Sequence, residues 1–367
     1  MKDMEIKYKI LVDAAEFREQ LEKDVRSARN EILIQTLSFE GDSVGKGITD
    51  LLLSLNAAPD IRILIDNFTR FILNDKFLYT WKNYFDADLT EEKHATREII
   101  SKLTENGVRV KFTSPVGLFF RRFAARNHKK IIAIDDKIAY IGGINFSEHN
   151  FSWHDMMLRI EDKQLIKFLK DDFELTWHDQ NYFRKLTLEG IEMHSLDGRT
   201  NERAFERLFQ IIDGAQEEIW VHSPYLSFPF LEKLLSAKRR GVKLGIITPE
   251  NNNRKFLKKY ISWEAIKNNI QMWYYQPGMS HMKAMLVDKR YLIVGSTNFD
   301  YISYRVHPEL MAIITDENLI REFQRRILEE DLKNSRNGYR QVSNLAGYYE
   351  KYKLYWLGRF FTRLSKF

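Results

Sequence analysis

The sequence predicts an α/β fold made of two similar halves, each built on a mostly parallel sheet flanked by helices. Helical stretches alternate with short apolar strands, and the same order of elements occurs twice along the chain. A short pattern of polar residues is also repeated at matching places in the two halves. With 367 residues, 44% of them hydrophobic, the chain is long enough for two halves and a substantial buried core.

The first half begins with a helix. Asp13 and Glu16 have the spacing of a capping box, and apolar residues at every fourth position predict a helix that ends near residue 29. A strand over 32–36, a helical stretch over 48–55 and an apolar strand over 61–66 follow. The polar and aromatic segment 69–97 comes next. It has no counterpart in the second half, and the sequence assigns it no role.

The second half repeats this order. Thr200 is placed to cap a helix that ends near Gly214, and a strand over 219–223 follows it. A helical stretch over 229–240 and a strand over 242–248 come next. We therefore expect three parts: a first half over 1–190, a second half over 191–340 and a C-terminal tail over 341–367.

The repeated pattern is a His, one residue, a Lys, four residues and an Asp. Its two copies are His128, Lys130 and Asp135, and His281, Lys283 and Asp288. An asparagine follows each His by seventeen residues, and an acid follows by twenty-seven or twenty-eight; these are Asn145 and Asn298, and Asp155 and Glu309. Such a triplet arises by chance about once in ten thousand positions. Two copies with matching downstream spacing therefore indicate duplicated chemistry.

Each motif is expected to lie on a short strand, over 130–135 and 283–288, followed by a turn and another strand over 138–141 and 291–294. A His and a Lys two positions apart on a strand point to the same face. They can therefore touch one ligand together.

These residue types suit transfer of a phosphoryl group without a metal or other cofactor. A neutral imidazole is a nucleophile near pH 7, and its protonated form is an acid, so two histidines allow a division of labour. The lysines would neutralise the nonbridging phosphate oxygens, and the asparagines would add hydrogen bonds. Asp155 and Glu309 are candidates for orienting the imidazoles through the far ring nitrogen.

The stretches HKKIIAID with GGIN, and HMKAMLVD with GSTN, resemble the paired motifs of the phospholipase D superfamily, and within it the bacterial cardiolipin synthases most. The resemblance implies a pseudo-twofold α/β fold with one shared active site and a covalent phosphohistidine. It implies that the catalytic residues are His128, Lys130, Asn145 and Asp155 from one half, and His281, Lys283, Asn298 and Glu309 from the other.

The resemblance also suggests individual roles. It makes Asp135 and Asp288 supporting residues of the motif, His128 the nucleophile and His281 the acid, although the sequence alone does not rank the two histidines. His307, two residues before Glu309, stands where members of the family often have Asn.

The other histidines are expected to be structural or at the surface, because none has a metal-binding spacing. They are His94, His149, His154, His178, His194, His222 and His307. His222 ends a strand near the expected site and could also touch substrate. The glycines Gly142, Gly143 and Gly295 are expected in a tight turn. The absence of cysteine excludes disulfides and thiolate chemistry.

The charge of the chain suits an anionic partner. Lys and Arg number 57 against 51 acids, a net charge of +6, and residues 111–134 and 347–367 are locally basic. In the tail, Tyr349, Tyr352, Trp356, Phe360 and Phe367 recur at helical spacing. This pattern fits an interfacial membrane helix, or a helix docked on the core with its aromatic side chains buried.

The leading hypothesis is a phosphatidyltransferase or phospholipase D that acts on phospholipid phosphodiesters, most concretely a cardiolipin synthase-like enzyme. The alternative is a nuclease of the same superfamily, for which nucleic acid would be the partner. A binding protein with a dead site is disfavoured, because both motifs are complete. No apolar stretch has the length of a signal-peptide core or of a membrane-spanning helix, so we expect a cytoplasmic protein that associates with the membrane surface. The sequence does not predict its oligomeric state.

Overall fold

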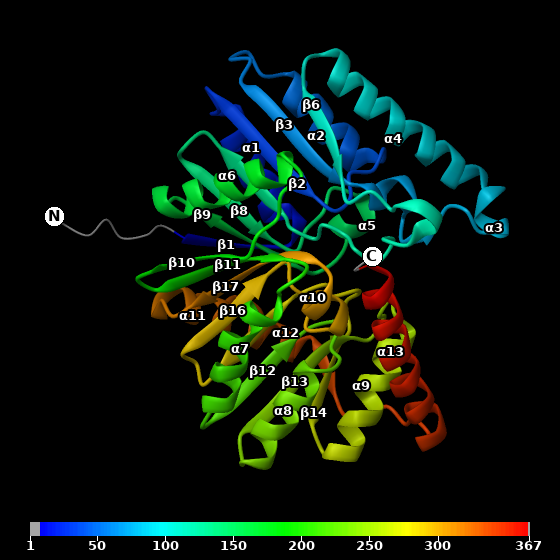
Figure 1. Ribbon diagram of the computed structural model, residues 1–367. Coiled ribbons are helices and arrows are strands. Elements are labelled where there is room, and N and C mark those ends of the chain that lie inside the picture. The colour runs from blue at the N-terminus through cyan, green and yellow to red at the C-terminus, as the bar shows by residue number, and fades with distance from the viewer. Residues whose placement is uncertain (1–7, 366–367) are drawn as a thin grey trace. The chain divides into compact units, whose positions relative to one another are not determined.

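The computed structural model describes residues 8–365, which form two compact units (Figure 1). The first unit holds the described residues up to 117, together with 126–152 and 156–181. The second holds 118–125, 153–155 and the described residues from 182 onward. Two short stretches of the first half of the sequence therefore fold with the second unit, and one of them contains Asp155.

The first unit is built on a seven-stranded sheet. In sheet order its strands are β1 (Tyr8–Val12), β9 (Met156–Ile160), β8 (Ile138–Gly142), β7 (Ile131–Ile134), β2 (Glu31–Thr36), β3 (Asp60–Asp66) and β6 (Arg109–Thr113). The pairs β2–β3 and β3–β6 are parallel, and the other four pairs are antiparallel.

The second unit is built on a nine-stranded sheet. Its strands are, in sheet order, β10 (Arg184–Leu188), β11 (Ile191–Asp197), β17 (Pro308–Ile314), β16 (Tyr291–Gly295), β15 (Ala284–Val287), β12 (Glu218–His222), β13 (Lys243–Pro249), β14 (Gln271–Tyr275) and β18 (Ser335–Asn337). Only β12–β13 and β13–β14 are parallel among these pairs.

From β11 to β14 the second sheet repeats the first, strand for strand and with the same sense at every pair. The predicted α/β class with two similar halves is confirmed. The expectation of mostly parallel sheets is wrong, because both sheets are mixed. A short turn joins each motif strand to the next strand, β7 to β8 and β15 to β16, and strands joined so tightly must run antiparallel.

The helices of the first unit are α1 (Asp13–Arg26), α2 (Ser43–Leu53), α3 (Trp81–Tyr84), α4 (Ala87–Glu105), α5 (Glu148–Phe151) and α6 (Lys163–Trp177). It also contains the 3₁₀ helix η1 (Asn67–Arg70) and the small hairpin β4 (Ile72–Leu73) and β5 (Lys76–Phe77). The first helix ends three residues earlier than expected, and Glu16 accepts a hydrogen bond from the Val12 backbone N–H at 3.1 Å.

The helices of the second unit are α7 (Glu202–Gly214), α8 (Phe230–Arg239), α9 (Lys255–Asn268), α10 (Tyr301–Arg305), α11 (Glu317–Phe323), α12 (Glu329–Lys333) and α13 (Asn344–Ser365). The short helix η2 (Leu118–Phe120) also belongs to it, and the π-helical turn η3 (Gln324–Leu328) joins α11 to α12.

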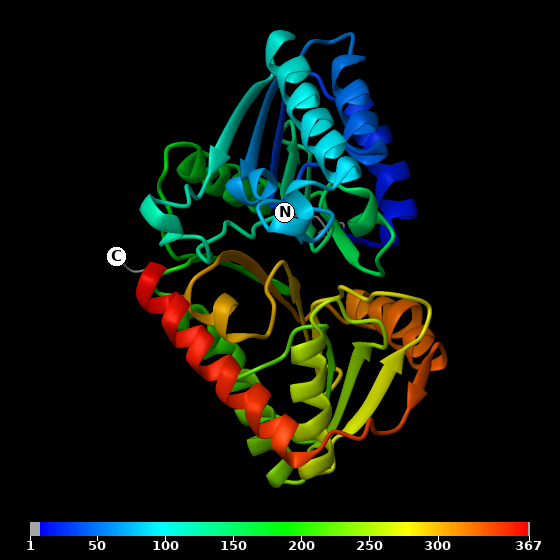
Figure 2. The ribbon, with the colours of Figure 1, turned by 90° about the vertical axis from the view of Figure 1, so that its right-hand side faces the viewer.

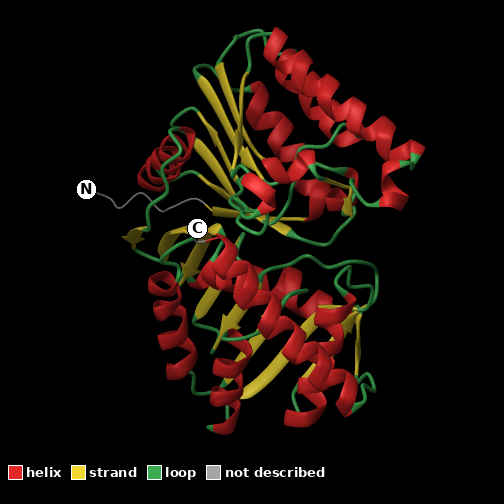
Figure 3. Ribbon diagram, turned by 45° about the vertical axis from the view of Figure 1, so that its right-hand side comes forward, coloured by secondary structure: helices red, strands yellow, loops and turns green. Residues whose placement is uncertain are grey.

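Figure 3 shows helices packed against the strands of both units. In the first unit, Ile34 and Ile63 face a core that includes side chains of α1, α2 and α4. The neighbouring Leu33 and Leu64 face the opposite way, toward Phe173 of α6. A central strand buried on both faces is apolar at consecutive positions, which explains the stretches 32–34 and 63–65 within EILIQT and DIRILID.

The two motif aspartates connect each motif strand to the loop before the neighbouring strand. Asp135 accepts hydrogen bonds from the backbone N–H groups of Arg29, Asn30 and Glu31. Asp288 does the same for Gln216, Glu217 and Glu218, at 2.8 to 2.9 Å. Burial acts to raise the pKa of each carboxyl, but these backbone bonds lower both pKa values below the usual range.

The C-terminal helix α13 packs along α9 in the second unit (Figure 2). Tyr348 contacts the ring of Trp263, with centroids 4.8 Å apart, and Tyr355 contacts Phe228 at 5.5 Å. The outer face of α13 is aromatic and exposed, with 62% of Tyr352 accessible to solvent. The other exposed side chains are Tyr349 at 63%, Trp356 at 68% and Phe360 at 56%. Lys366 and Phe367, which belong to the expected tail, lie outside the described residues.

Candidate active site

The first motif begins on the loop that leads into β7. The residue before His128 is held by the end of β3, because Asp66 accepts a hydrogen bond from the Asn127 backbone N–H at 2.6 Å. Asp66 also pairs with Arg126 at 3.1 Å. Complete burial raises the pKa of Asp66, although Arg126 opposes the shift. A buried ion pair thus positions the backbone from which His128 projects.

Consecutive side chains of this segment alternate between two environments, as expected for an extended chain. The ammonium group of Lys129 pairs with Asp172 of α6 at 2.8 Å, and both side chains are buried. Lys130 lies on the other face, where it donates a hydrogen bond to the backbone carbonyl of His128 at 2.9 Å. Lys129 therefore has a structural role in the core, whereas Lys130 lies close to His128.

The amide of Asn145, which follows β8, is held at both ends. Its Oδ1 accepts a hydrogen bond from the Thr36 hydroxyl at 3.4 Å, and its Nδ2 donates one to Asn150 at 3.1 Å. The equivalent Asn298 in the second unit is also buried, but its Oδ1 has no hydrogen-bond partner within residues 8–365. A buried amide oxygen without a partner is costly, so it marks a place where a ligand could donate a hydrogen bond.

The second motif contains an oriented histidine. His281 Nδ1 lies 2.8 Å from Asp155 Oδ2, and both side chains are buried. Because an ionised carboxylate only accepts hydrogen bonds, the contact with Asp155 favours the tautomer with hydrogen on Nδ1 and leaves Nε2 as the reactive nitrogen, although Lys283 Nζ also lies 2.8 Å from Nδ1. The rings of Trp153 and Tyr225 pack on the imidazole, with centroids 5.1 and 5.9 Å away.

Lys283 completes this arrangement. Its ammonium group donates to the His281 carbonyl oxygen and lies 3.7 Å from Asp155. Complete burial lowers its pKa to about 8, although the carboxylates of Asp155 and Glu309 pull in the opposite direction. A buried lysine with a shifted pKa and specific charged neighbours is typical of a functional site.

The sequence grouped Asp155 with His128, in the first half, but the structure pairs it with His281. The segment 153–155 folds with the second unit, where His154 forms a parallel β-bridge with Ser280. The His154 backbone N–H donates to the Met279 carbonyl at 2.9 Å, and the His281 N–H donates to the His154 carbonyl at 2.7 Å. These backbone bonds place Asp155 against the imidazole.

A buried cluster that the sequence analysis did not identify lies behind this pair. Asp331 of α12 contacts His154 Nε2 at 3.0 Å and His222 Nδ1 at 2.9 Å. The other ring nitrogen of His222 bonds the Ser280 hydroxyl at 2.8 Å. Burial acts to raise the pKa of Asp331, but His222 and His154 outweigh it and lower the pKa to about 2. No local spacing links Asp331 to either histidine, so only the folded chain reveals the cluster.

Glu309 lies at the start of β17 and is fully buried. It accepts hydrogen bonds from the hydroxyls of Ser296 and Ser303, the latter at 2.9 Å. His307 Nδ1 lies 3.7 Å from Glu309 Oε1, and its Nε2 lies 3.0 Å from the Ala124 carbonyl oxygen. His307, which replaces the Asn common in the family, therefore lies next to the carboxylate of Glu309.

The candidate residues thus fall into two groups. His128, Lys130 and Asn145 lie in the first unit. The second unit contains Asp155, His281, Lys283, Asn298 and Glu309.

The fold and these motifs define a protein with two phospholipase D-like halves. The family described as "Cardiolipin synthase, PLD-like domain" matches residues 21–177 and 208–331, and the chain belongs to this family.

Curated relatives include the probable cardiolipin synthase YwiE of Bacillus subtilis, which is 26% identical over 354 residues, 89% of this chain and 66% of that protein. Cardiolipin synthase 1 of Staphylococcus epidermidis is 26% identical over 361 residues, 90% of this chain and 68% of that protein. The chain spans about two thirds of the length of these relatives.

Solved structures agree on the fold. Phosphatidylserine synthase from Haemophilus influenzae matches with a TM-score of 0.70 and 14% identity, over 96% of this chain and 92% of that one. Polyphosphate kinase from Porphyromonas gingivalis matches with a TM-score of 0.60 and 14% identity, over 96% of this chain and 53% of the kinase. Among the described helices, none is both long and apolar enough to span a bilayer.

Replacing Asp331 with Asn should destabilise the second unit by about 2–3 kcal/mol, because two buried imidazoles lose their charged acceptor. The free energy of unfolding in urea, followed by tryptophan fluorescence, measures the change. Glu329→Gln removes the same charge from an exposed position of the same helix and should change stability by less than about 0.5 kcal/mol. Equal effects from the two substitutions would contradict a structural role for the cluster.

Proposed function

We propose that this protein is a phosphatidyltransferase of the phospholipase D type that acts on phospholipid phosphodiesters, in the manner of a cardiolipin synthase. The observation that carries the proposal is the duplicated motif, because each copy keeps its His, Lys and Asn and the second copy has an oriented His281–Asp155 pair. Membership of the family and its curated relatives support the same chemistry.

In the proposed first step the two motifs meet at one phosphodiester. Nε2 of His128 attacks the phosphorus, the bond from phosphorus to the leaving oxygen breaks, and protonated His281 donates its proton to that oxygen. The product is a phosphatidyl-histidine and a free alcohol. In the second step neutral His281 takes the proton from an acceptor alcohol, whose oxygen attacks phosphorus and displaces His128. The glycerol hydroxyl of phosphatidylglycerol is the proposed acceptor.

The remaining residues stabilise charge and geometry. Lys130 and Lys283 would neutralise the nonbridging oxygens, and the amides of Asn145 and Asn298 would donate hydrogen bonds to them. Asp155 accepts from Nδ1 of His281, which favours its imidazolium form. By the internal repeat, Glu309 of the second half would accept a hydrogen bond from Nδ1 of His128. This proposal is supported by the pairing of Asp155, from the first half of the sequence, with His281 of the second motif.

The proposed site makes a direct prediction about turnover. Purified protein incubated with phosphatidylglycerol vesicles should form cardiolipin and glycerol, which lipid mass spectrometry detects. His128→Ala and His281→Ala should each reduce the rate by about 10³-fold or more, because neither step proceeds without its nucleophile or its acid. His178→Ala, which changes an exposed histidine of the first unit, is the matched control and should keep full activity.

The nuclease alternative is tested in the same experiment with labelled single-stranded DNA. Its support is the basic segment 111–134, in which Arg121 and Arg122 are exposed. Cleavage of DNA with no conversion of lipid would replace the phosphatidyltransferase proposal. High activity in His128→Ala together with an inert His281→Ala would reverse the roles assigned to the histidines.

The lowered pKa of Lys283 predicts the upper pH limit of activity. The ammonium form is the one that neutralises phosphate, so kcat/KM should fall about tenfold per pH unit above a pH of about 8. The limit in kcat should lie at higher pH, because bound phosphate favours the charged lysine. In Lys283→Arg the guanidinium stays charged, so the residual activity should lose this limit.

The control for this pH profile is Lys243→Arg, the same exchange at an exposed position of the second unit. It should keep the limit near pH 8. A limit that stays near pH 8 in Lys283→Arg would assign the titration to another group.

We also propose that the exposed aromatic face of α13 contacts the membrane surface. Tyr349, Tyr352, Trp356 and Phe360 are each more than half exposed, although the opposite face of the helix packs on the second unit. The helix is therefore docked, but the aromatic side chains that the docked alternative would bury point outward. Aromatic rings beside cations such as Arg359 suit the interface of an anionic bilayer.

Replacing these four aromatic residues with Ser in one variant should weaken binding to phosphatidylglycerol vesicles by at least about tenfold, because their apolar area leaves the interface. Vesicle sedimentation measures the binding. Tyr182→Ser changes an exposed tyrosine elsewhere in the second unit and should bind like the original chain. Unchanged binding by the fourfold variant would restrict α13 to a packing role.

A further inference from the structure

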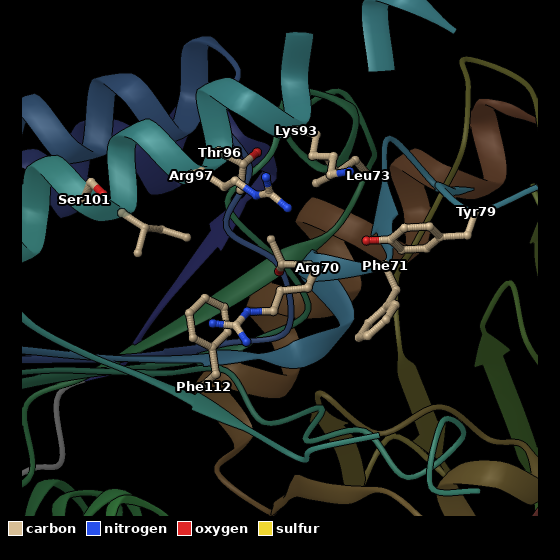
Figure 4. A pocket seen from close by; sticks show the side chains of 11 residues that line it. Arg70, Phe71, Leu73, Tyr79, Lys93, Thr96, Arg97, Ser101 and Phe112 are labelled. Atoms are coloured by element: carbon tan, nitrogen blue, oxygen red, sulfur yellow. The ribbon is translucent and has the colours of Figure 1, made fainter. Parts of the chain in front are cut away.

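The first unit contains a cavity of about 460 Å³ that none of the motif residues lines (Figure 4). Its walls come from η1, the β4–β5 hairpin, α4 and β6. Part of its lining belongs to the stretch 69–86, for which the second unit has no counterpart between β13 and β14, whereas α4 takes the place that α9 has there. A cavity built in part by a stretch that only the first unit contains is not part of the duplicated chemistry, so it requires an explanation of its own.

The lining of the cavity carries positive charge. Arg70, Lys93 and Arg97 contribute side chains to it, and no acidic residue does. None of these three cations forms an ion pair with any residue in the described range 8–365. Arg70 and Arg97 are exposed and Lys93 is half-buried, so all three are within reach of a ligand from solvent. Three unbalanced cations around one cavity therefore favour an anion that comes from outside the chain.

The cationic wall is held in place before any ligand binds. The guanidinium of Arg70 lies 3.8 Å from the centroid of the Phe112 ring, and the Lys93 ammonium lies 5.4 Å from that of Tyr79. Figure 4 shows Lys93 and Arg97 projecting from α4, with Arg70 stacked on Phe112 across from them. Cation–π contacts restrict these long side chains and so reduce the entropy lost on binding.

A buried hydrogen bond fixes the position of α4 at the cavity. The Thr96 hydroxyl accepts from the Gly41 backbone N–H and donates to the Glu92 carbonyl, both at 2.8 Å. By contrast, the hydroxyls of Tyr79 and Ser101, which also line the cavity, make no hydrogen bond within the described part of the chain. The cavity therefore offers hydroxyl donors as well as charge, and phosphate oxygens accept both.

An exposed aromatic cluster follows the cavity residue Tyr79 in the sequence. Trp81 is 85% exposed, Tyr84 60% and Phe85 67%, and the rings of Trp81 and Tyr84 each lie 5.2 Å from that of Phe85. Contiguous exposed aromatic side chains are rare on soluble surfaces and usually mark a binding site. They lie on α3 or directly after it, and α3 packs against α4, which supplies Lys93 and Arg97 to the cavity; this arrangement fits an amphiphile with a phosphate head.

We infer that this cavity is a second binding site, separate from the duplicated motifs, for the phosphate group of an organic phosphate ester. Arg70, Lys93 and Arg97 bind the phosphate, and Trp81, Tyr84 and Phe85 contact the apolar part of the ligand. The shared chemistry is the phosphate ester, which a lipid head group or a soluble phosphoester could supply. The exposed aromatic cluster favours the lipid.

Phosphomonoesters test the site without turnover, because the proposed reaction acts on diesters. Calorimetry should show that the full chain binds dihexanoyl phosphatidic acid more tightly than glycerol 3-phosphate, and does not bind neutral dihexanoylglycerol. Hydrogen–deuterium exchange should show protection by the bound phosphoester in peptides of residues 69–112. This local readout separates the cavity from any binding at the histidines, so it stands whether or not the chain proves to be a phosphatidyltransferase.

Arg70→Gln and Arg97→Gln should each weaken the Kd roughly tenfold or more and remove the protection of 69–112, because each loses a charged hydrogen-bond donor. Lys23→Gln removes the same charge from an exposed position of α1 and should leave both unchanged. Thermal unfolding of each variant checks that the first unit stays folded.

Two outcomes support the site and distinguish its ligand. Tighter binding of phosphatidic acid than of glycerol 3-phosphate assigns the site to lipid, and equal binding assigns it to a soluble phosphoester. Absence of phosphoester protection in 69–112, or equal protection in the folded arginine variants and the original chain, would overturn the inference.

Discussion

The hydrogen bond between Asp155 and His281 is the contact on which the candidate chemistry of the second unit depends. It selects the tautomer in which Nε2 is reactive, and it joins a residue from the first half of the sequence to the motif of the second. Asp155 reaches this position only because its neighbours are fixed. The segment 153–155 shares backbone hydrogen bonds with residues 279–281, and Asp331 ties His154 to His222 behind it. A buried polar cluster with its main contacts satisfied is rigid, which is what an oriented imidazole requires.

The duplication extends from the reactive residues to the scaffold. Seven strands recur in the same order and with the same sense, and in each copy the motif aspartate accepts hydrogen bonds from three backbone amides before the neighbouring strand. This explains why a residue remote from the reactive nitrogen belongs to the motif. The motif aspartate holds the loop that leads into the neighbouring central strand. It thereby also holds the motif strand, next to which the His and Lys side chains project.

The two copies also differ in ways that matter for function. The first unit alone contains the stretch 69–86, which together with α4 builds a cationic cavity and carries exposed aromatic side chains. The second unit alone contains α13, whose outer face is aromatic. Duplication thus accounts for the shared chemistry, whereas the segments unique to each copy present the surfaces suited to an amphiphilic partner.

The sequence by itself determined the α/β class, the internal repeat and the identity of the motif residues, because periodic hydrophobicity and fixed spacings are local properties. The predicted direction of the strands was wrong. Helix–strand alternation suggested parallel pairing, whereas the tight hairpins β7–β8 and β15–β16 require antiparallel pairing. Which carboxylate orients His281, and the presence of Asp331 beside His154, were decided by the tertiary structure alone. These contacts join residues more than a hundred positions apart, and nothing in the local pattern of the chain records which distant groups burial brings together.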